Sequence, residues 1–224
     1  MHLELQCKTR QLDERMTNQG VGNLFIVASP SGGGKTSLIK CLVADLDQIK
    51  VSVSHTTRDK RAGEVDGEHY YFVDEATFFR MKDDGQFIEH AQVFNHYYGT
   101  SRHVIEAHLQ CGVDVVLDID WQGAQQIKRQ FTQAVSVFIL PPSLQVLEKR
   151  LLERQRDDHA VINERMQRAQ QELSHYDEFD FLIVNDEFNH ALAQLMSIVV
   201  AERLKRDRQV LYLAELLSFL LQTQ

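Results

Sequence analysis

The stretch Ser29-Pro30-Ser31-Gly32-Gly33-Gly34-Lys35-Thr36 decides the fold. Its last three residues match the end of the phosphate-binding pattern G-x-x-x-x-G-K-[ST], although Ser29 stands in the place of the first glycine. The apolar run before it, residues 24–28, predicts a buried strand, and apolar residues at helical spacing over residues 36–46 predict a helix. A glycine-rich turn between a buried strand and a helix predicts a P-loop.

Each part of this loop suits the phosphates of ATP. Three consecutive glycines let backbone N–H groups turn toward a phosphate without clashes of Cβ atoms. The ammonium group of Lys35 is expected to reach the β- and γ-phosphate oxygens, and the hydroxyl of Thr36 to bind Mg²⁺. The alternative, a flexible surface turn, conflicts with the strand and helix on either side. Ser29 leaves the tightness of the ATP loop open.

Outward from the loop, apolar runs alternate with helical segments. Buried strands are expected at residues 51–54, 113–119, 135–140 and 181–184, and helices at residues 101–111, 122–130, 144–154, 161–173, 188–206 and 210–221. This alternation predicts βαβ units, so the expected fold class is α/β with a parallel sheet flanked by helices. Ligands of such sheets bind at the carboxyl ends of the strands.

The composition excludes several classes of partner. The 224 residues are 43% hydrophobic and 25% charged, and the formal net charge is −8. Such an acidic chain is not suited to coating nucleic acid or an anionic membrane. No apolar run reaches the roughly 18 residues of a transmembrane helix. Residues 1–21 are polar and of mixed charge, which predicts a loosely ordered extension of a cytoplasmic protein.

Three stretches after the second expected strand point to the substrate. They are SVSHTTRDKRAGE at residues 52–64, GEHYYF at residues 67–72 and NHYYGTS at residues 95–101. In these stretches the chain resembles the guanylate kinase family, whose signatures are S-x-T-T-R-x-x-R-x-G-E and Y-Y-G-[TS]. The resemblance extends over residues 23–206 and includes LDIDWQG at residues 117–123 and LIVND at residues 182–186.

The resemblance implies a division of the chain into a core and two inserted parts. A P-loop NTPase core would comprise residues 22–53, 104–144 and 171–224. A GMP-binding region would occupy residues 54–103, and a helical lid residues 145–170. The implied reaction is Mg²⁺-dependent transfer of a phosphoryl group from ATP to GMP or dGMP, in purine nucleotide metabolism.

Two arginines on one loop are candidate ligands of the GMP phosphate. Arg58 and Arg61 are three residues apart, and each guanidinium can donate two parallel hydrogen bonds to one phosphate. Tyr70 and Tyr98 can add hydroxyl hydrogen bonds, and Glu64 belongs to the same signature. A solvated basic loop, and ordinary packing of the tyrosines, are the alternatives.

Ser54, Glu89 and Thr100 resemble the family's guanine-binding residues. Guanine presents N1–H and N2–H₂ as adjacent donors, which one carboxylate can accept together. Adenine has a lone pair at N1 and would be repelled. A site built on such hydrogen bonds rejects the wrong base by roughly 10⁴-fold, because buried polar groups would otherwise stay unpaired.

Two carboxylates end the strand at residues 113–119. Either Asp118 or Asp120 can hold a water of the Mg²⁺ shell, as an acidic residue beside a P-loop does. The resemblance also implies that Asp120 lies near GMP. The sequence leaves the division of these roles open, with Asp118 as the candidate metal ligand through water.

The charged helices after Pro142 resemble the family's lid. The resemblance implies that Arg154 and Arg165 close on the ATP phosphates, that Arg150 lies along the adenine, and that Asn185 contacts the adenine. Arg58, Arg154, Arg165 and Lys35 are then the catalytic set. A solvated helix face is the alternative reading of the three lid arginines.

Two other functions stay open at this point. Some domains of this type are interaction modules without catalysis, and other P-loop kinases act on different phosphorylated acceptors. The presence of Lys35, Thr36, Arg58, Arg61 and Glu89 favours a working guanylate kinase. A leucine-rich face within residues 210–221 is expected to pack in the core, with a subunit contact as its alternative, so a homo-oligomer is possible.

Overall fold

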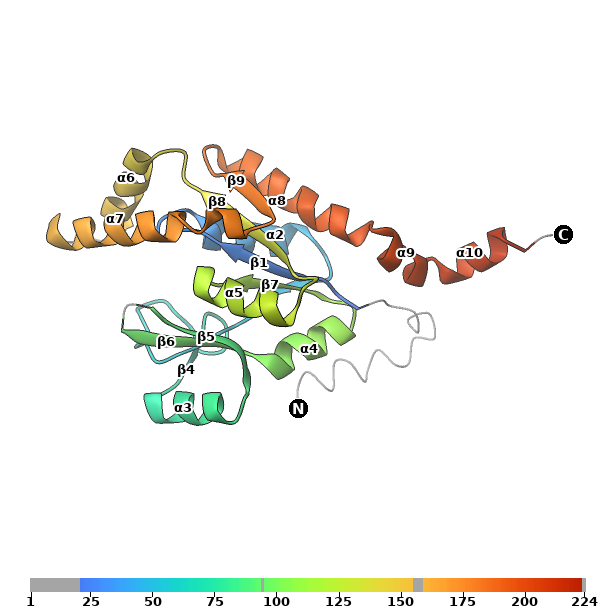
Figure 1. Cartoon of the computed structure of the whole chain (residues 1–224), viewed down its shortest axis with the longest axis horizontal. Coiled ribbons are helices and arrows are strands. Elements are labelled where there is room, and N and C mark those ends of the chain that lie inside the picture. The colour runs from blue at the N-terminus through green and yellow to red at the C-terminus, as the bar shows by residue number, and fades with distance from the viewer. Residues whose placement is uncertain (1–20, 94, 155–158, 223–224) are drawn as a thin grey trace.

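The structure is a computed structural model that describes residues 21–93, 95–154 and 159–222, without the side chains of residues 153–165. Nearly all of the extension expected at residues 1–21 lies outside this range. Figure 1 shows a central sheet with helices on both faces, a smaller sheet below it, and helices that project at either end. Within the described ranges, no helix has the length and apolar composition needed to cross a membrane.

The central sheet has five parallel strands. They are β1 (Leu24–Ala28), β2 (Ile49–Val51), β7 (Asp114–Asp118), β8 (Val135–Leu140) and β9 (Phe181–Val184), in the order β2-β7-β1-β8-β9. All five residues of β1 are buried, as a central parallel strand requires. The second strand lies earlier than the expected residues 51–54 and ends at Val51, and the backbone carbonyl of Ser54 already accepts the N–H of Tyr71 in the second sheet.

Helices cover both faces of the central sheet and complete its core. On one face α2 (Lys35–Asp45) and α8 (Phe188–Arg203) pack apolar side chains such as Leu38 and Leu195 against the strands. On the other face α4 (Arg102–Gln110) and α5 (Trp121–Gln130) do so with Ile105 and Ile127. The expected α/β fold with a parallel sheet flanked by helices is confirmed.

A second sheet carries the candidate acceptor residues. It has the order β4-β3-β6-β5, with β3 (His55–Thr56), β4 (Tyr71–Phe72), β5 (Phe87–Val93) and β6 (His96–Ser101). Helix α3 (Glu75–Asp83) packs Phe78 against the rings of Phe87 and Tyr97. Asp74 caps this helix, because its carboxylate accepts the N–H of Thr77 at 2.7 Å.

A pair of helices projects beside the carboxyl ends of the central strands (Figure 1). Helix α6 (Leu144–Arg154) and helix α7 (His159–Leu173) share a small apolar cluster of Leu147, Leu151 and Ala169. The short 3₁₀ helix η2 (Tyr176–Glu178) then leads into β9. The second helix begins two residues before the expected start at residue 161.

The C-terminal helices differ from the expectation. In place of helices at residues 188–206 and 210–221, α8 ends at Arg203, followed by α9 (Arg206–Tyr212) and α10 (Ala214–Leu220). Lys205 leaves the helical conformation, with φ −54° and ψ 135°. The expected core packing of the leucine face is wrong, because neither α9 nor α10 has a buried residue. Both faces of the central sheet are already covered by other helices.

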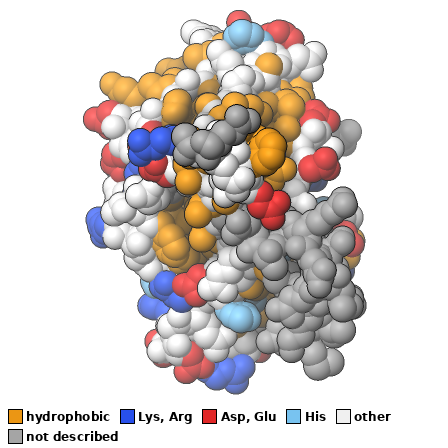
Figure 2. All heavy atoms as spheres, turned by 90° about the vertical axis from the view of Figure 1, so that its right-hand side faces the viewer, with side chains coloured by type: hydrophobic (Ala, Val, Ile, Leu, Met, Phe, Trp, Pro, Cys, Tyr) orange, Lys and Arg blue, Asp and Glu red, His pale blue; other side chains and the backbone are white. Residues whose placement is uncertain are grey.

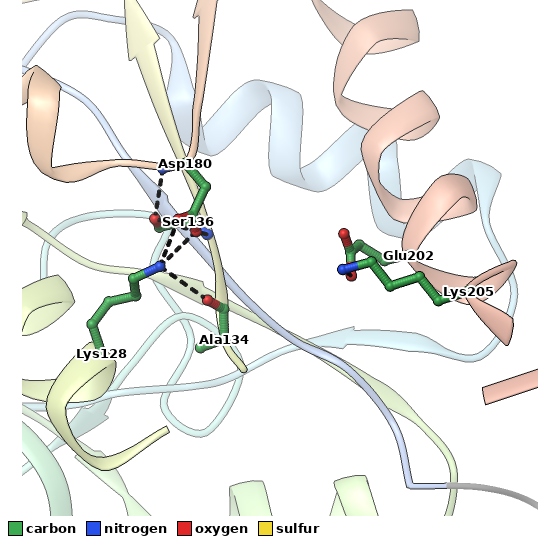
Figure 3. Close-up of polar contacts among 6 residues, drawn as sticks. All are labelled: Lys128, Ala134, Ser136, Asp180, Glu202 and Lys205. Carbon is green, nitrogen blue, oxygen red and sulfur yellow. Dashed lines mark hydrogen bonds and ion pairs between the residues drawn. The ribbon is translucent and has the colours of Figure 1, made fainter. Parts of the chain in front are cut away.

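Two acidic residues tie distant elements together. The carboxylate of Asp180 accepts hydrogen bonds from Lys128 of α5 and from the backbone and hydroxyl of Ser136 in β8 (Figure 3). Asp114, which is completely buried, accepts from Arg203 Nε and Arg208 Nη1, both at 2.7 Å. Asp114 therefore joins β7 to the end of α8 and to α9.

Asp114→Ala should destabilise the fold strongly. It leaves two partly buried guanidinium groups without their carboxylate, and breaking such a buried pair costs about 3–5 kcal/mol. Urea unfolding followed by circular dichroism measures the free energy of unfolding. Asp207→Ala removes the carboxylate of a pair in which both side chains are exposed, and is the matched control, with little change expected. Equal losses in the two variants would contradict this account of Asp114.

Candidate active site

The P-loop connects β1 to α2 in a conformation that needs glycine. Gly34 has φ +93°, and a Cβ atom on it would lie 2.3 Å from Nδ2 of Asn185. That same amide nitrogen donates to the backbone carbonyl of Gly33 at 2.9 Å. Ser29, in contrast, does not adopt positive φ, so the first position of this loop does not need glycine.

The two projecting helices contact the P-loop directly. Leu147 and Leu151 of α6 lie against Gly32. Near the end of α7, the carboxylate of Glu172 accepts the backbone N–H of Ser31 at 2.9 Å. Burial raises the pKa of Glu172, while that hydrogen bond and the charge of Lys35 act in the opposite direction. The position of α7 is therefore coupled to the shape of the loop.

Lys35 and Thr36 meet one acidic side chain at the end of β7. The ammonium group of Lys35 lies 2.7 Å from Oδ1 of Asp118, and the hydroxyl of Thr36 donates to Oδ2 at 3.1 Å. Lys35 also donates to the backbone carbonyl of Ile119 at 2.7 Å. These contacts follow from the pairing of β1 with β7, which aligns Val27 with Asp118.

The oxygen donors beside the loop fit a magnesium ion. A hydroxyl and a carboxylate within hydrogen-bond distance are hard ligands, and Mg²⁺ is held in proteins by one or two such groups together with water and phosphate oxygens. The carboxylate of Asp120 instead caps α5 by accepting the N–H of Gly123 at 3.0 Å.

Arg58 is held in place by an acidic neighbour on the same loop. Its Nη2 lies 2.6 Å from Oε1 of Glu64, and its Nη1 donates to the backbone carbonyl of Asp59 at 2.7 Å. The other oxygen of Glu64 accepts the N–H of Arg61 at 2.8 Å. The hydrogen bond from Arg58 lowers the pKa of Glu64, so the pair is ionic. Glu64 fixes the loop on which both arginines lie.

Two tyrosines border Arg58. Tyr70 and Tyr98 have ring centroids 5.9 Å apart, and the guanidinium of Arg58 lies 5.4 Å from the Tyr70 ring. Burial raises the pKa of Tyr70 to about 12, and the negative charge of Asp118 adds to this effect. Tyr70 therefore stays protonated and can act as a hydrogen-bond donor.

Ser54, Glu89 and Thr100 form a buried polar cluster on three strands or their ends. Thr100 donates to the carboxylate of Glu89, and the hydroxyls of Ser54 and Thr100 are 3.1 Å apart. Because the one hydroxyl proton of Thr100 is directed to Glu89, Ser54 donates to Thr100. Burial raises the pKa of Glu89 to about 7, and the negative charge of Asp120 contributes.

Helix α5 approaches this cluster so closely that only glycine fits there. A Cβ atom on Gly123 would lie 2.8 Å from Oε2 of Glu89. The carboxylate of Asp120, three residues earlier, accepts the backbone N–H of Gly123. The structure thus separates the two carboxylates that end β7, since Asp118 contacts Lys35 and Thr36 while Asp120 lies on the Glu89 side.

A cavity of about 320 Å³ lies on the other side of the P-loop. Arg150 of α6 borders it and donates to the backbone carbonyl of Asn185 at 3.0 Å. Its second nitrogen, Nη1, is buried and has no hydrogen-bond partner among the residues described. The lining is completed by Gly32, Gly34, Ser37, Asn185, Asp186 and Phe188. The side chains of Arg154 and Arg165 lie outside the described residues.

Comparison with known proteins identifies the family of this site. A family model described as guanylate kinase matches residues 21–202. The guanylate kinase of Legionella pneumophila (strain Paris) is 58% identical over 209 residues, which cover 93% of this chain and 100% of that protein.

The chain belongs to the guanylate kinase family.

A more distant relative and a solved structure agree with this assignment. The guanylate kinase of Coxiella burnetii (strain RSA 493 / Nine Mile phase I) is 49% identical over 202 residues, 90% of this chain and 98% of that protein. The crystal structure of guanylate kinase from Anaplasma phagocytophilum matches with a TM-score of 0.72 and 36% identity. That match covers 85% of this chain and 90% of the solved one.

Three residues of the site were not foreseen from the sequence. Glu172 is one of many charged residues on a helix that the sequence indicated to be solvated. Phe188 has no polar group that would indicate a binding role. Gly123 stood inside the quoted LDIDWQG stretch, but its closeness to Glu89 depends on contacts between α5 and β5.

Glu172→Ala should weaken nucleotide binding at the P-loop relative to Glu172→Gln. Both variants lack the negative charge, but only glutamine keeps an oxygen that can accept the N–H of Ser31. A lost hydrogen bond of this kind corresponds to roughly 3- to 10-fold in the dissociation constant of ATP. Isothermal titration calorimetry measures it. Equal affinity of the two variants would contradict a role of this bond in shaping the loop.

Proposed function

We propose that this chain transfers the γ-phosphoryl group of ATP to GMP or dGMP, forming ADP and GDP or dGDP. The observation that carries the proposal is the buried carboxylate of Glu89, which faces the core across Gly123. Of the common bases, guanine offers two adjacent N–H donors to such a carboxylate. A hydroxyl pair beside it, Ser54 and Thr100, can adjust its donors and acceptors to the remaining edge of the base.

The acceptor phosphate is bound by the loop of Arg58 and Arg61. Glu64 holds Arg58 and the backbone of Arg61, so the loop is preorganised before GMP arrives. The protonated hydroxyl of Tyr70 and that of Tyr98 donate to the same phosphate. Two guanidinium groups offset the repulsion between the two nucleotides, which lets a phosphate oxygen of GMP approach the γ-phosphorus of ATP.

ATP occupies the P-loop and the cavity beside Arg150. Loop N–H groups and Lys35 bind the β- and γ-phosphates. The adenine lies between Arg150 and Asn185, where Nη1 of Arg150, which is buried and has no hydrogen-bond partner among the described residues, gains a ligand. Thr36 and, through a water molecule, Asp118 would hold Mg²⁺, which would neutralise charge on the ATP phosphates. Arg154 and Arg165 are assigned to the γ-phosphate by the family resemblance.

Transfer itself needs positioning more than proton chemistry. The bond between the γ-phosphorus and the bridging oxygen of ADP breaks as the bond to the GMP phosphate oxygen forms. That oxygen is already ionised near pH 7, so no general base is required. Water must be excluded to prevent hydrolysis of ATP. Closure of residues 54–103 and 145–170 over the core performs this role, with α7 and Glu172 moving relative to Ser31.

Turnover should require a guanine base. In a coupled assay of ADP release with ATP and Mg²⁺, we expect activity with GMP and dGMP and almost none with AMP, CMP or UMP. Glu89→Gln should raise the KM for GMP by about 10- to 100-fold and leave the KM for ATP nearly unchanged, because one charged acceptor is lost. Folded protein without turnover on any nucleotide would favour an interaction module instead.

Binding of GMP should weaken as the pH falls. The pKa of Glu89, about 7, lies above that of a free carboxyl, so the accepting carboxylate is present above pH 7 and is lost below it. Between pH 8 and pH 6 its population falls about tenfold, and the KM for GMP should rise by a similar factor. Glu89→Gln controls for titration of the GMP phosphate itself. An equally steep rise in that variant would refute the assignment to Glu89.

A further inference from the structure

The first of the two C-terminal helices, α9, is attached to the core. Arg208 of α9 and Arg203 of α8 both bind the buried carboxylate of Asp114. Gln209 donates to the backbone carbonyl of Arg203 at 3.0 Å. At the turn between α8 and α9, Lys205 lies 2.8 Å from Glu202 (Figure 3). Helix α9 is therefore held in position at this end of the molecule, and α10 follows it directly and contacts it.

These helices nevertheless expose a large apolar face. Six of its side chains are between 50% and 76% exposed, namely Leu211, Tyr212, Leu216, Phe219, Leu220 and Leu221. Figure 2, which looks onto this end of the molecule, shows hydrophobic side chains gathered there. Single exposed leucines are common on soluble proteins, whereas a contiguous face of this size marks an interaction site.

The apolar face is separate from the candidate active site. Figure 1 places α9 and α10 at the end of the molecule opposite α6 and α7, which border the P-loop. The family model ends at residue 202, so both helices also lie beyond the region that it describes. Binding of nucleotides therefore does not account for the leucines.

The size of the face suits a contact between two protein molecules. The six side chains expose on the order of 700 Å² together, close to the roughly 800 Å² that each partner buries in a standard interface. Most soluble oligomers are symmetric assemblies of identical chains, and a twofold contact needs only one patch that fits itself. An apolar helix face meets this requirement because it carries no directional pattern of charge.

The charges around the face favour a second copy over a lipid surface. The chain has a net charge of −8, so two copies repel each other over most of their surfaces and can approach only where few charges lie. Residues 209–222 contain a single charged side chain, Glu215, and the basic residues Arg206 and Arg208 precede it. Helices that bind membranes carry lysine or arginine along their polar face, and α10 has neither.

We propose that α9 and α10 pack against the same helices of a second copy, so that the protein is a twofold symmetric dimer. The contact buries the leucine face of both copies. Because the candidate active sites lie at the far ends, both stay open to nucleotides. The dimer does not depend on the proposed reaction.

The mass of the full chain in solution tests this proposal. Light scattering coupled to size-exclusion chromatography should give twice the chain mass of 25.9 kDa. The double variant Leu216→Glu with Phe219→Glu should give 25.9 kDa, since carboxylates at the centre of an apolar contact raise the dissociation constant of the dimer by at least about 100-fold. Retained phosphotransferase activity, or an unchanged circular dichroism spectrum if no activity exists, shows that the variant is folded.

A matched control uses an exposed apolar residue elsewhere. Leu144→Glu, at the first position of α6, should leave the mass of the dimer unchanged. A wild-type protein that is monomeric at every concentration would overturn the proposal, as would a double variant that remains dimeric. A monomer that floats with vesicles of anionic phospholipid would assign the face to lipid and would overturn it too.

Discussion

The contact between Lys35 and Asp118 is the constraint around which the site is built. It exists because β1 and β7 are neighbours in a parallel sheet, which brings the P-loop and an acidic strand end to the same edge. The same carboxylate accepts the hydroxyl of Thr36, so a carboxylate, a hydroxyl and a lysine lie together beside the P-loop. Asn185, Leu147 and Glu172 then hold the loop from three sides, by contacts from β9, α6 and α7.

The acceptor site depends on a second sheet placed against this edge. Gly123 lies at the start of α5 and has no Cβ atom. Glu89 of the second sheet can therefore approach the core closely there, since a Cβ atom on Gly123 would lie 2.8 Å from Oε2 of Glu89. Burial of that carboxylate raises its pKa to about 7, which makes it sensitive to whether a guanine donates to it. In the proposed reaction, selectivity for the base therefore depends on this packing contact.

Much of this could be predicted from the sequence, because the decisive residues sit in short local patterns. The P-loop and the loop of Arg58 are each formed by one continuous stretch of sequence. The alternation of strands and helices indicated the parallel sheet. The roles of Asp118 and Asp120 could not be separated, since both end one strand and only the cap of α5 distinguishes them. Glu172 looked like part of a solvated helix. The C-terminal leucines were misassigned because periodicity predicts an apolar face but not what covers it. The side chains of Arg154 and Arg165 stay predictions.

The most direct test of the account is the number of protons released when GMP binds. If guanine binds the carboxylate form of Glu89, a pKa raised to about 7 means that Glu89 is partly protonated at pH 6.5 and releases a proton when GMP binds. Calorimetry in buffers of different ionisation enthalpy measures that number. The difference between wild type and Glu89→Gln isolates Glu89 from the phosphate. Greater proton release by the wild type than by Glu89→Gln is predicted, and equal proton release by both proteins would contradict the account.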